Sequence, residues 1–428
     1  MTRSIATQNE RRGDSASRDV QHTDNLETKV TMTEVPKHQK PEKAEPEEIE
    51  STTTDNENAK NEESITVNAP QRPDPTDTDL MTWVCTYLAE GVPPAKEISQ
   101  KILDEHEYKI SYSRVYKYLT KAAQLRWFHM SVPINWSLSD KIKSLYPYLE
   151  RVEVVNSDMF NPVAGRGAKM IFELLRGFHV AFKDKDGVHI GIAGGHMLNR
   201  TCGRLGQTLL EAFNLNSKKA MKELPRELHI HSMVAGFDAC EPMTDPNTMM
   251  AIIDRDVPLK FNYVALHARG IVESDRYETI RRDTAVKEAF RRKKQLQMIV
   301  TGLGSWSDEN DTFRKRMSDS KKSMIKLERH GIVGNMMYRP IGPNGPIETE
   351  TEKRALTLME LSEFPQFIAN NGKVVLLCGP CFNGGCRSNV LKTILDQPNL
   401  HPEKPSQLVS HVVIDRQTAF ELVCMSEG

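Results

Sequence analysis

The sequence predicts an α/β protein: a mostly parallel, doubly wound (Rossmann-like) sheet domain preceded by a small winged helix-turn-helix domain and a disordered N-terminal tail. Three observations support this prediction. Strand and helix patterns alternate from residue 151 onward, which is typical of a parallel sheet covered by helices on both faces. Three short helical patterns and one extended segment occupy residues 77–135. Residues 1–76 are strongly polar, which explains why only 38% of the 428 residues are hydrophobic.

The tail over residues 1–76 consists almost entirely of Glu, Lys, Asp, Thr, Asn, Ser, Gln and Pro, and contains no aromatic residue. Such a segment buries too little apolar surface to offset the entropy lost on ordering, so we expect a disordered, acidic tail. It lacks the apolar core of a secretory signal, and no run of 18 apolar residues occurs in the chain. Seven cysteines, an odd number, favour a reducing environment over a disulfide framework. We therefore expect a cytoplasmic protein.

The winged helix-turn-helix prediction for residues 77–135 depends on apolar spacing. Helical patterns cover 79–90, 94–106 and 111–128, and the third places Val115, Leu119 and Ala122 on its inward side. Residues 126–134 are extended and amphipathic, like the strand of a wing. A helical interaction module with a solvated basic face is the alternative.

In a winged helix-turn-helix the start of the third helix enters the major groove of DNA. There its hydroxyl groups and cations meet phosphates and base edges. The candidate DNA-binding residues are Ser111, Tyr112, Ser113, Arg114, Lys117 and Lys121.

A connector helix over residues 136–150 leads into the effector domain, residues 151–428. We expect strands at 151–156, 188–195, 228–236, 261–268, 296–304, 373–380 and 408–415, and a β-rich piece at 331–347. Helices are expected at 165–178, 198–213, 245–256, 283–295 and 387–397.

Four of the expected strands end in glycine-rich turns, at 191–195, 235–236, 302–304 and 379–385. Parallel sheets bind ligands at the carboxyl ends of their strands, and amides at helix N-termini bind anions there. Neither the dinucleotide fingerprint G-x-G-x-x-G nor a phosphate loop with Gly-Lys-Ser/Thr is present. Arg269 lies just past a strand end and is a candidate phosphate partner, although a surface position explains it equally well.

Four other features of the sequence are explained by structure rather than by metal binding or catalysis. Cys378, Cys381 and Cys386 lack a nearby fourth ligand, so we predict no metal site and no cofactor. His229 and His231 alternate on a strand and are expected to be held by the sheet. The basic run from residue 281 to 294 is expected to be a solvated helix face. No nucleophile stands beside a base, so we do not expect an enzyme.

The order of the motifs resembles that of the SorC/DeoR-type sugar-binding transcriptional regulators, whose effector domain is similar in fold to sugar-phosphate isomerases and deaminases. The resemblance spans residues 78–425 and includes "GIAGGHML", "YVALHARGIVES", "HGIVGNMMYRPIGPNGPI" and "LLCGPCFNGGCRSNVLKTIL". It implies a homodimer or homotetramer that binds operator DNA, with an affinity that changes when a phosphorylated sugar or similar effector binds. The alternatives are a sugar-phosphate isomerase-like enzyme and a scaffold or binding protein that has lost effector sensing.

The resemblance also implies where the effector binds. The phosphate loop is residues 194–198, where the family often has Gly-x-Thr, and "TGLGS" looks like the family's Gly-Ile-Gly-Ser turn. Asn335 stands where the family has an Asp that holds sugar hydroxyls, and Arg387 stands where it has a phosphate-binding Lys. The predicted effector site is Gly194, Gly195, His196, Met197, Leu198, Arg269, Gly302, Gly304, Asn335, Gly384, Gly385 and Arg387.

Overall fold

The computed structural model describes residues 74–90, 92, 95–125, 132–181, 187–236, 242–348, 351–380 and 386–427. The chain divides into two units, Met1–Arg72 and Pro73–Gly428. The predicted tail therefore lies outside the described residues, except for residues 74–76.

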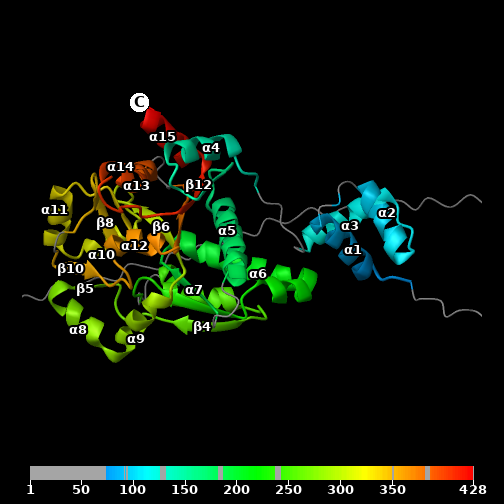
Figure 1. The fold of residues 1–428 in the computed structure, drawn as a ribbon, viewed down its shortest axis with the longest axis horizontal. Coiled ribbons are helices and arrows are strands. Elements are labelled where there is room, and N and C mark those ends of the chain that lie inside the picture. The colour runs from blue at the N-terminus through cyan, green and yellow to red at the C-terminus, as the bar shows by residue number, and fades with distance from the viewer. Residues whose placement is uncertain are drawn as a thin grey trace, which may run out of the picture. The chain divides into compact units, whose positions relative to one another are not determined.

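Three helices form a small module with its own core (Figure 1): α1 (Asp77–Ala89), α2 (Ala95–His106) and α3 (Tyr112–Gln124). A capping box between Thr76 and Asp79 begins α1. The core is made by buried side chains that include Leu80, Val84, Ile98, Ile102 and Val115.

The three predicted helices of this module are confirmed, with two corrections to their inward faces. The apolar spacing places Leu88 of the first helix and Leu103 of the second on the inward side, but each is 40% exposed, whereas Met81 and Tyr118 are buried in the core. Most of the predicted wing strand, residues 126–131, lies outside the described residues.

The predicted parallel sheet is confirmed. Its strands lie in the order β1 (Arg151–Val155), β12 (His411–Asp415), β11 (Lys373–Cys378), β6 (Met298–Ser305), β2 (Val188–Ile192), β3 (Glu227–Ser232) and β4 (Lys260–Val264). All neighbouring pairs along this path are parallel. The chain runs outward from β2 to β4 and then returns to the other side of β2. This reversal makes the gap between β2 and β6 a topological switch point, where sheets of this kind bind ligands.

Helices cover both faces of the sheet, as predicted. One face carries α5 (Phe160–Ala181), α6 (His196–Glu223) and α7 (Pro246–Asp254), whose apolar residues share a core with β2 and β6. The helices of the other core cluster are α4 (Trp136–Leu145), α8 (Tyr277–Arg282), α9 (Thr284–Arg292), α10 (Thr312–Met317), α11 (Lys321–Arg329), α12 (Phe364–Ala369), α13 (Cys386–Leu395) and α15 (Arg416–Glu427). A short helix, α14 (Gln397–Leu400), and the antiparallel pair β5 (Ile271–Glu273) and β10 (Lys353–Ala355) complete this body. No helix in the described part of the chain is long and apolar enough to cross a membrane.

The predicted strand at 296–304 is confirmed as β6, but its last residues, 302–304, continue the strand and do not form the predicted glycine-rich turn. Parallel pairing with β11 ends at Gly302, but the last three residues of β6 pair antiparallel with β7 (Gly334–Met336). β8 (Arg339–Gly342) and β9 (Gly345–Pro346) extend this antiparallel arm and confirm the predicted β-rich piece. This antiparallel arm places residues of the β7–β8 hairpin beside the switch point.

Candidate functional site

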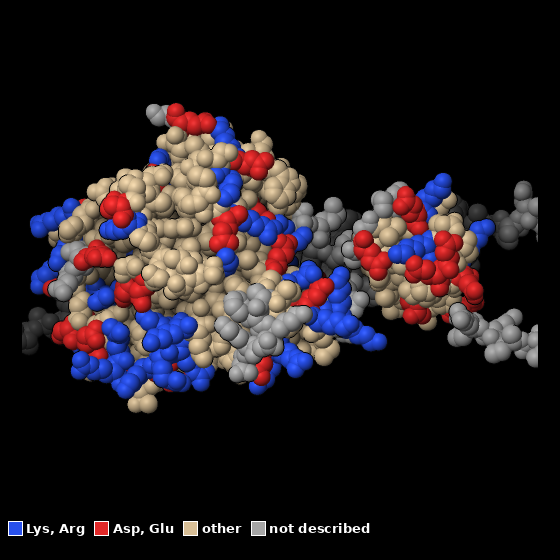
Figure 2. Space-filling model, in the orientation of Figure 1, with Lys and Arg blue, Asp and Glu red and all other residues tan. Residues whose placement is uncertain are grey.

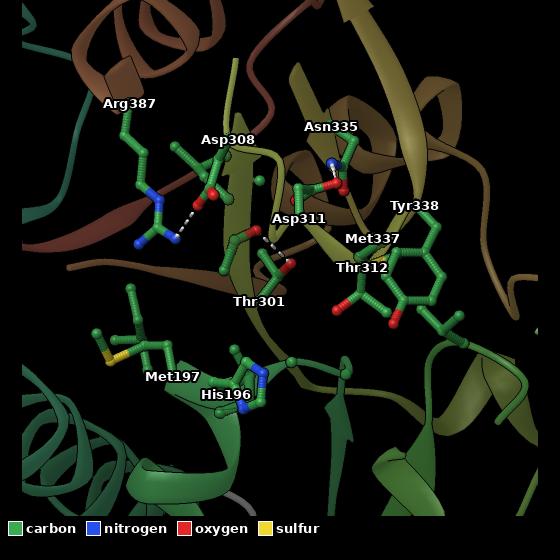
Figure 3. Close-up of a pocket in the computed structure, with 18 of the residues that line it drawn as sticks. His196, Met197, Thr301, Asp308, Asp311, Thr312, Asn335, Met337, Tyr338 and Arg387 are labelled. Atoms are coloured by element: carbon green, nitrogen blue, oxygen red, sulfur yellow. Dashed lines mark hydrogen bonds and ion pairs between the residues drawn. The ribbon is translucent and has the colours of Figure 1, made fainter. Parts of the chain in front are cut away.

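A cavity of about 400 Å³ lies at the carboxyl ends of β2, β6 and β11, beside the switch point (Figure 3). Its wall combines the start of α6, the end of β6, the loop from β6 to α10, the β7–β8 hairpin and the start of α13. The lining residues are Phe160, Gly194, Gly195, His196, Met197, Leu198, Val234, Thr301, Gly302, Leu303, Gly304, Asp308, Asn310, Asp311, Thr312, Lys315, Asn335, Met337, Tyr338, Leu377 and Arg387.

The N-terminus of α6 forms one side of the cavity. Gly195 is the N-cap of this 28-residue helix and has φ of +112°, a backbone conformation that residues other than glycine rarely adopt. No side chain caps the helix. The first-turn amides of an α-helix have no partner within the helix, and its dipole places partial positive charge at this end. No acidic residue lies in the first turn of α6. This side of the cavity is therefore suited to an anion.

Arg387 of α13 supplies a cation on the opposite side of the cavity, where Figure 3 shows it beside Asp308. Its Nη1 donates hydrogen bonds to the carbonyls of Gly379 (2.9 Å) and Pro380 (3.0 Å), and its Nη2 lies 3.9 Å from Asp308 Oδ2. The guanidinium also lies over the ring of Phe160, 5.7 Å from its centroid. Its Nε is buried and donates no hydrogen bond to a described residue. The guanidinium is thus held in the cavity wall, with a buried Nε that no described residue satisfies.

Asp311 and Asn335 form a polar wall between these two ends. Asp311 caps α10 by accepting from the amide of Arg314 (2.9 Å), and it accepts from Asn335 Nδ2 (3.0 Å). Burial raises the pKa of the Asp311 carboxyl to about 6. Gly304 is required here, because a Cβ at this position would collide with both polar side chains. The wall presents acceptors and donors of the kind that bind hydroxyl groups.

The turn of the β7–β8 hairpin completes the wall with two strained residues. Met337 and Tyr338 have φ of +53° and +58°, and both are buried. A two-residue hairpin turn with two positive φ values normally carries Asn and Gly. Residues other than Gly, Asn and Asp in this conformation cost free energy and cluster at functional sites. The strain therefore points to the same cavity as the polar groups do.

The structure brings together nine of the twelve residues of the predicted effector site. These are Gly194, Gly195, His196, Met197, Leu198, Gly302, Gly304, Asn335 and Arg387. Arg269 does not line the cavity: its side chain is exposed on the loop between β4 and β5. Gly384 and Gly385 lie outside the described residues.

Sequence reasoning missed the polar and aromatic residues of the wall, among them Asp308, Asp311, Thr312, Lys315 and Tyr338. The segment "SDENDTF" did hold a signal, since an Asp before a short helical pattern is typical of a helix N-cap. It did not show that the cap faces a cavity. That depends on the antiparallel arm beside it.

The predicted DNA-binding residues lie on and just before α3. Ser111 caps the helix by accepting from the amide of Arg114 (3.4 Å), and Tyr112 is 50% exposed. Arg114 donates to the hydroxyl of Tyr118 (3.2 Å), while Lys121 pairs with Asp77 at 3.0 Å. Tyr116, which was not predicted, is also exposed on this helix.

The histidines singled out in the sequence contact a third histidine in the sheet. His189 Nδ1 lies 2.9 Å from His231 Nε2, and the His189 ring stacks on His229 with centroids 4.1 Å apart. Burial lowers the pKa of His189 to about 4 and that of His231 to about 3, so both rings are neutral near pH 7. Within the described ranges, no three His, Cys, Asp or Glu side chains are grouped to hold a metal ion. Cys378 is buried, and Cys381 lies outside those ranges.

Comparison with known proteins identifies relatives of the body. A family model described as "Putative sugar-binding domain" matches residues 138–370, more than half of the chain. The full-length sorbitol operon regulator SorC from Klebsiella pneumoniae is similar in structure, with a TM-score of 0.57 and 14% identity over 82% of this chain and 100% of that one. A DeoR family transcriptional regulator from Listeria monocytogenes has a TM-score of 0.48 and 16% identity over 67% of this chain and 98% of that one. The comparison with curated protein sequences finds no match.

Proposed function

Because the chain belongs to the sugar-binding domain family whose model matches residues 138–370, we propose that it is a transcriptional regulator controlled by a small effector. The effector is a phosphorylated sugar or a related molecule, bound in the cavity between α6 and α13. The protein binds operator DNA through α3, as a homodimer or homotetramer.

One observation carries the effector assignment: two anion-binding features face each other across a polar cavity (Figure 3). The uncapped start of α6 offers amides and a positive dipole end, and Arg387 offers a buried Nε without a hydrogen bond to a described residue. Asp311 and Asn335 offer hydrogen bonds suited to hydroxyl groups. A molecule that carries one phosphate and several hydroxyl groups satisfies all three.

The DNA-binding assignment depends on α3 and on the similarity in fold to the sorbitol operon regulator. Ser111, Tyr112 and Tyr116 present hydroxyl groups at the start of the helix, and Lys117 is exposed beside them. Such groups contact phosphates and base edges in the major groove.

Calorimetric titration with sugar phosphates and with the matching unphosphorylated sugars tests the effector site. We expect a phosphorylated sugar to bind and its unphosphorylated form to bind far more weakly. Arg387→Ala should weaken binding about 10- to 100-fold, the effect of losing a charge-assisted hydrogen bond of about 1.5–3 kcal/mol. The affinity of the Arg387→Lys protein should lie between those of the wild type and Arg387→Ala, because lysine keeps the positive charge but lacks the Nε donor.

Arg269→Ala is the matched control, since it removes an exposed Arg outside the cavity. Equal affinity of the Arg387→Ala and Arg269→Ala proteins for the phosphorylated sugar would contradict the site. Turnover of the sugar phosphate by the wild-type protein would favour the enzyme alternative.

Capture of genomic DNA fragments followed by sequencing tests the DNA-binding role. We expect one enriched sequence, whose affinity changes when the sugar phosphate is added. Lys117→Ala should reduce its affinity about 5- to 10-fold, as expected for one phosphate contact. Lys169→Ala, an exposed lysine of α5, should leave affinity unchanged. Fragments enriched without any common sequence would argue against a regulator.

A further inference from the structure

The strongest charged feature that the proposed function does not use is the basic surface of α8 and α9. Residues 276–294 contain eight Lys or Arg and three Asp or Glu, a net charge of +5 in a chain whose overall net charge is -1. Figure 2 shows Lys and Arg side chains gathered over these two helices, at lower left. We call Arg276, Arg282, Lys287, Arg291, Arg292 and Lys294 the α8–α9 surface.

Most of this positive charge is not neutralised by neighbours. Arg291 and Arg292 share a single partner, Glu288, at 2.7 and 2.8 Å. Arg282, Lys287 and Lys294 are exposed and form no ion pair with a described residue.

A solvated helix face explains only part of this pattern. Opposite charges four residues apart stabilise such a face, and Glu278–Arg282, Asp283–Lys287 and Glu288–Arg292 have that spacing. However, residues 276–294 hold only these three carboxylates for eight cations, so most of the positive charge is left in excess. Cations near a helix C-terminus are favourable, and this accounts for Arg291 and Arg292 at the end of α9. Neither effect removes the net charge of +5 over residues 276–294. A concentrated positive surface of this kind is suited to a polyanion.

The helical module, by contrast, carries little positive charge. Residues 74–125 contain six Lys or Arg and eight Asp or Glu, a net charge of -2. Two of the six cations, Arg114 and Lys121, already lie near the carboxylate of Asp77. Binding to DNA derives most of its non-specific affinity from neutralised phosphates, and this module offers few cations for them.

We propose that the α8–α9 surface binds the phosphate backbone of double-stranded DNA. This inference extends the proposed function and rests on it for the identity of the polyanion. Arginine side chains bind phosphate groups in a bidentate manner, and lysines act as point charges, so the surface gives affinity without sequence preference.

The test is a titration of the full chain with a random-sequence duplex at several salt concentrations. The triple variant Arg282→Gln, Lys287→Gln, Lys294→Gln removes three cations that form no ion pair with any described residue. If each contacts a phosphate, the slope of log affinity against log salt should become shallower by about 2 to 3, and affinity at low salt should fall about tenfold or more.

The control variant Lys169→Gln, Lys321→Gln, Lys404→Gln removes the same charge from exposed positions elsewhere on the body. It should keep the wild-type slope, and circular dichroism should show both variants folded. Equal slopes for the two variants would overturn the inference and leave operator reading by α3 intact. Failure of the wild-type protein to bind the random-sequence duplex would also overturn the inference. Capture of genomic fragments would then test specific operator binding separately. Displacement of the duplex by equimolar polyglutamate would instead indicate an acidic protein partner and overturn the inference.

Discussion

At the scale of single residues, Asp311 gives the cavity a measurable pH dependence. Burial raises the pKa of its carboxyl to about 6, so between pH 4 and pH 6 the native state binds a proton that the unfolded state has released. Stability from this group is therefore present at low pH and is lost as pH rises toward 6. The rise of this pKa from its ordinary value near 4 to about 6 corresponds to about 3 kcal/mol.

Asp311→Asn should raise the free energy of unfolding at pH 7.5 by up to about 3 kcal/mol, and by about 1 kcal/mol at pH 4.5. The amide keeps an oxygen that can accept from Arg314 and Asn335. Urea unfolding of both proteins at the two pH values measures the difference. Glu309→Gln changes an exposed carboxylate in the same loop and should show no such dependence. If the free energies of unfolding of Asp311→Asn and wild type differ by the same amount at both pH values, the Asp311 carboxyl is not the titrating group.

The residues of the cavity divide into those that motifs could predict and those they could not. Gly194 and Arg387 are far apart in sequence, but each follows a parallel strand, and such strand ends meet at one edge of a sheet. Asp311 and Tyr338 follow no such rule. They reach the cavity because the end of β6 pairs antiparallel with β7, and no spacing of residues in the sequence predicts this pairing.

At the scale of elements, the start of α6 offers a sharp test of backbone conformation. Gly195 has φ of +112°, and a Cβ there would meet no atom within 4 Å. Gly195→Ala should therefore cost about 1–3 kcal/mol through the backbone alone, and it should weaken sugar phosphate binding by shifting the first-turn amides. Gly177→Ala, in the interior of α5 and equally open, should instead stabilise by about 0.5–1 kcal/mol. Chemical denaturation and calorimetry measure both effects, and similar values for the two variants would contradict the role given to Gly195.

The parallel strands and several of the long helices were predictable, and the shortest helices were not. The strands of the sheet and helices such as α6 and α9 follow from apolar periodicity over many residues. The six-residue helices α10 and α12 are too short for a period to be read. The β7–β8 turn was missed for another reason, since Met337 and Tyr338 occupy positions where Asn and Gly would have marked a hairpin.

At the scale of the whole molecule, the fold class followed from the order of elements, because alternating strands and helices leave few topologies for a parallel sheet. The doubly wound sheet was confirmed, but the antiparallel pairing of the end of β6 with β7 was not predicted, since it depends on a partner strand some 30 residues away. The core arrangement adds a consequence for stability. The side chains of α1–α3 pack around their own core, while the body has one core on each face of its sheet.

This separation of cores predicts that effector binding stabilises the body and not the helical module when DNA is absent. A ligand at about 100 times its dissociation constant adds roughly 2.7 kcal/mol to the unit that binds it. Hydrogen exchange of the most protected amides of β6 and β11 should therefore slow about 100-fold with saturating sugar phosphate, because these amides open only when the body unfolds. Amides of α1–α3 should change less than about twofold, and Arg387→Ala should reduce the slowing in the body to about 2- to 10-fold at the same ligand concentration. Equal slowing in both parts would mean that they unfold as one cooperative unit, and control of operator affinity would then act through a direct stabilisation of the DNA-binding helices.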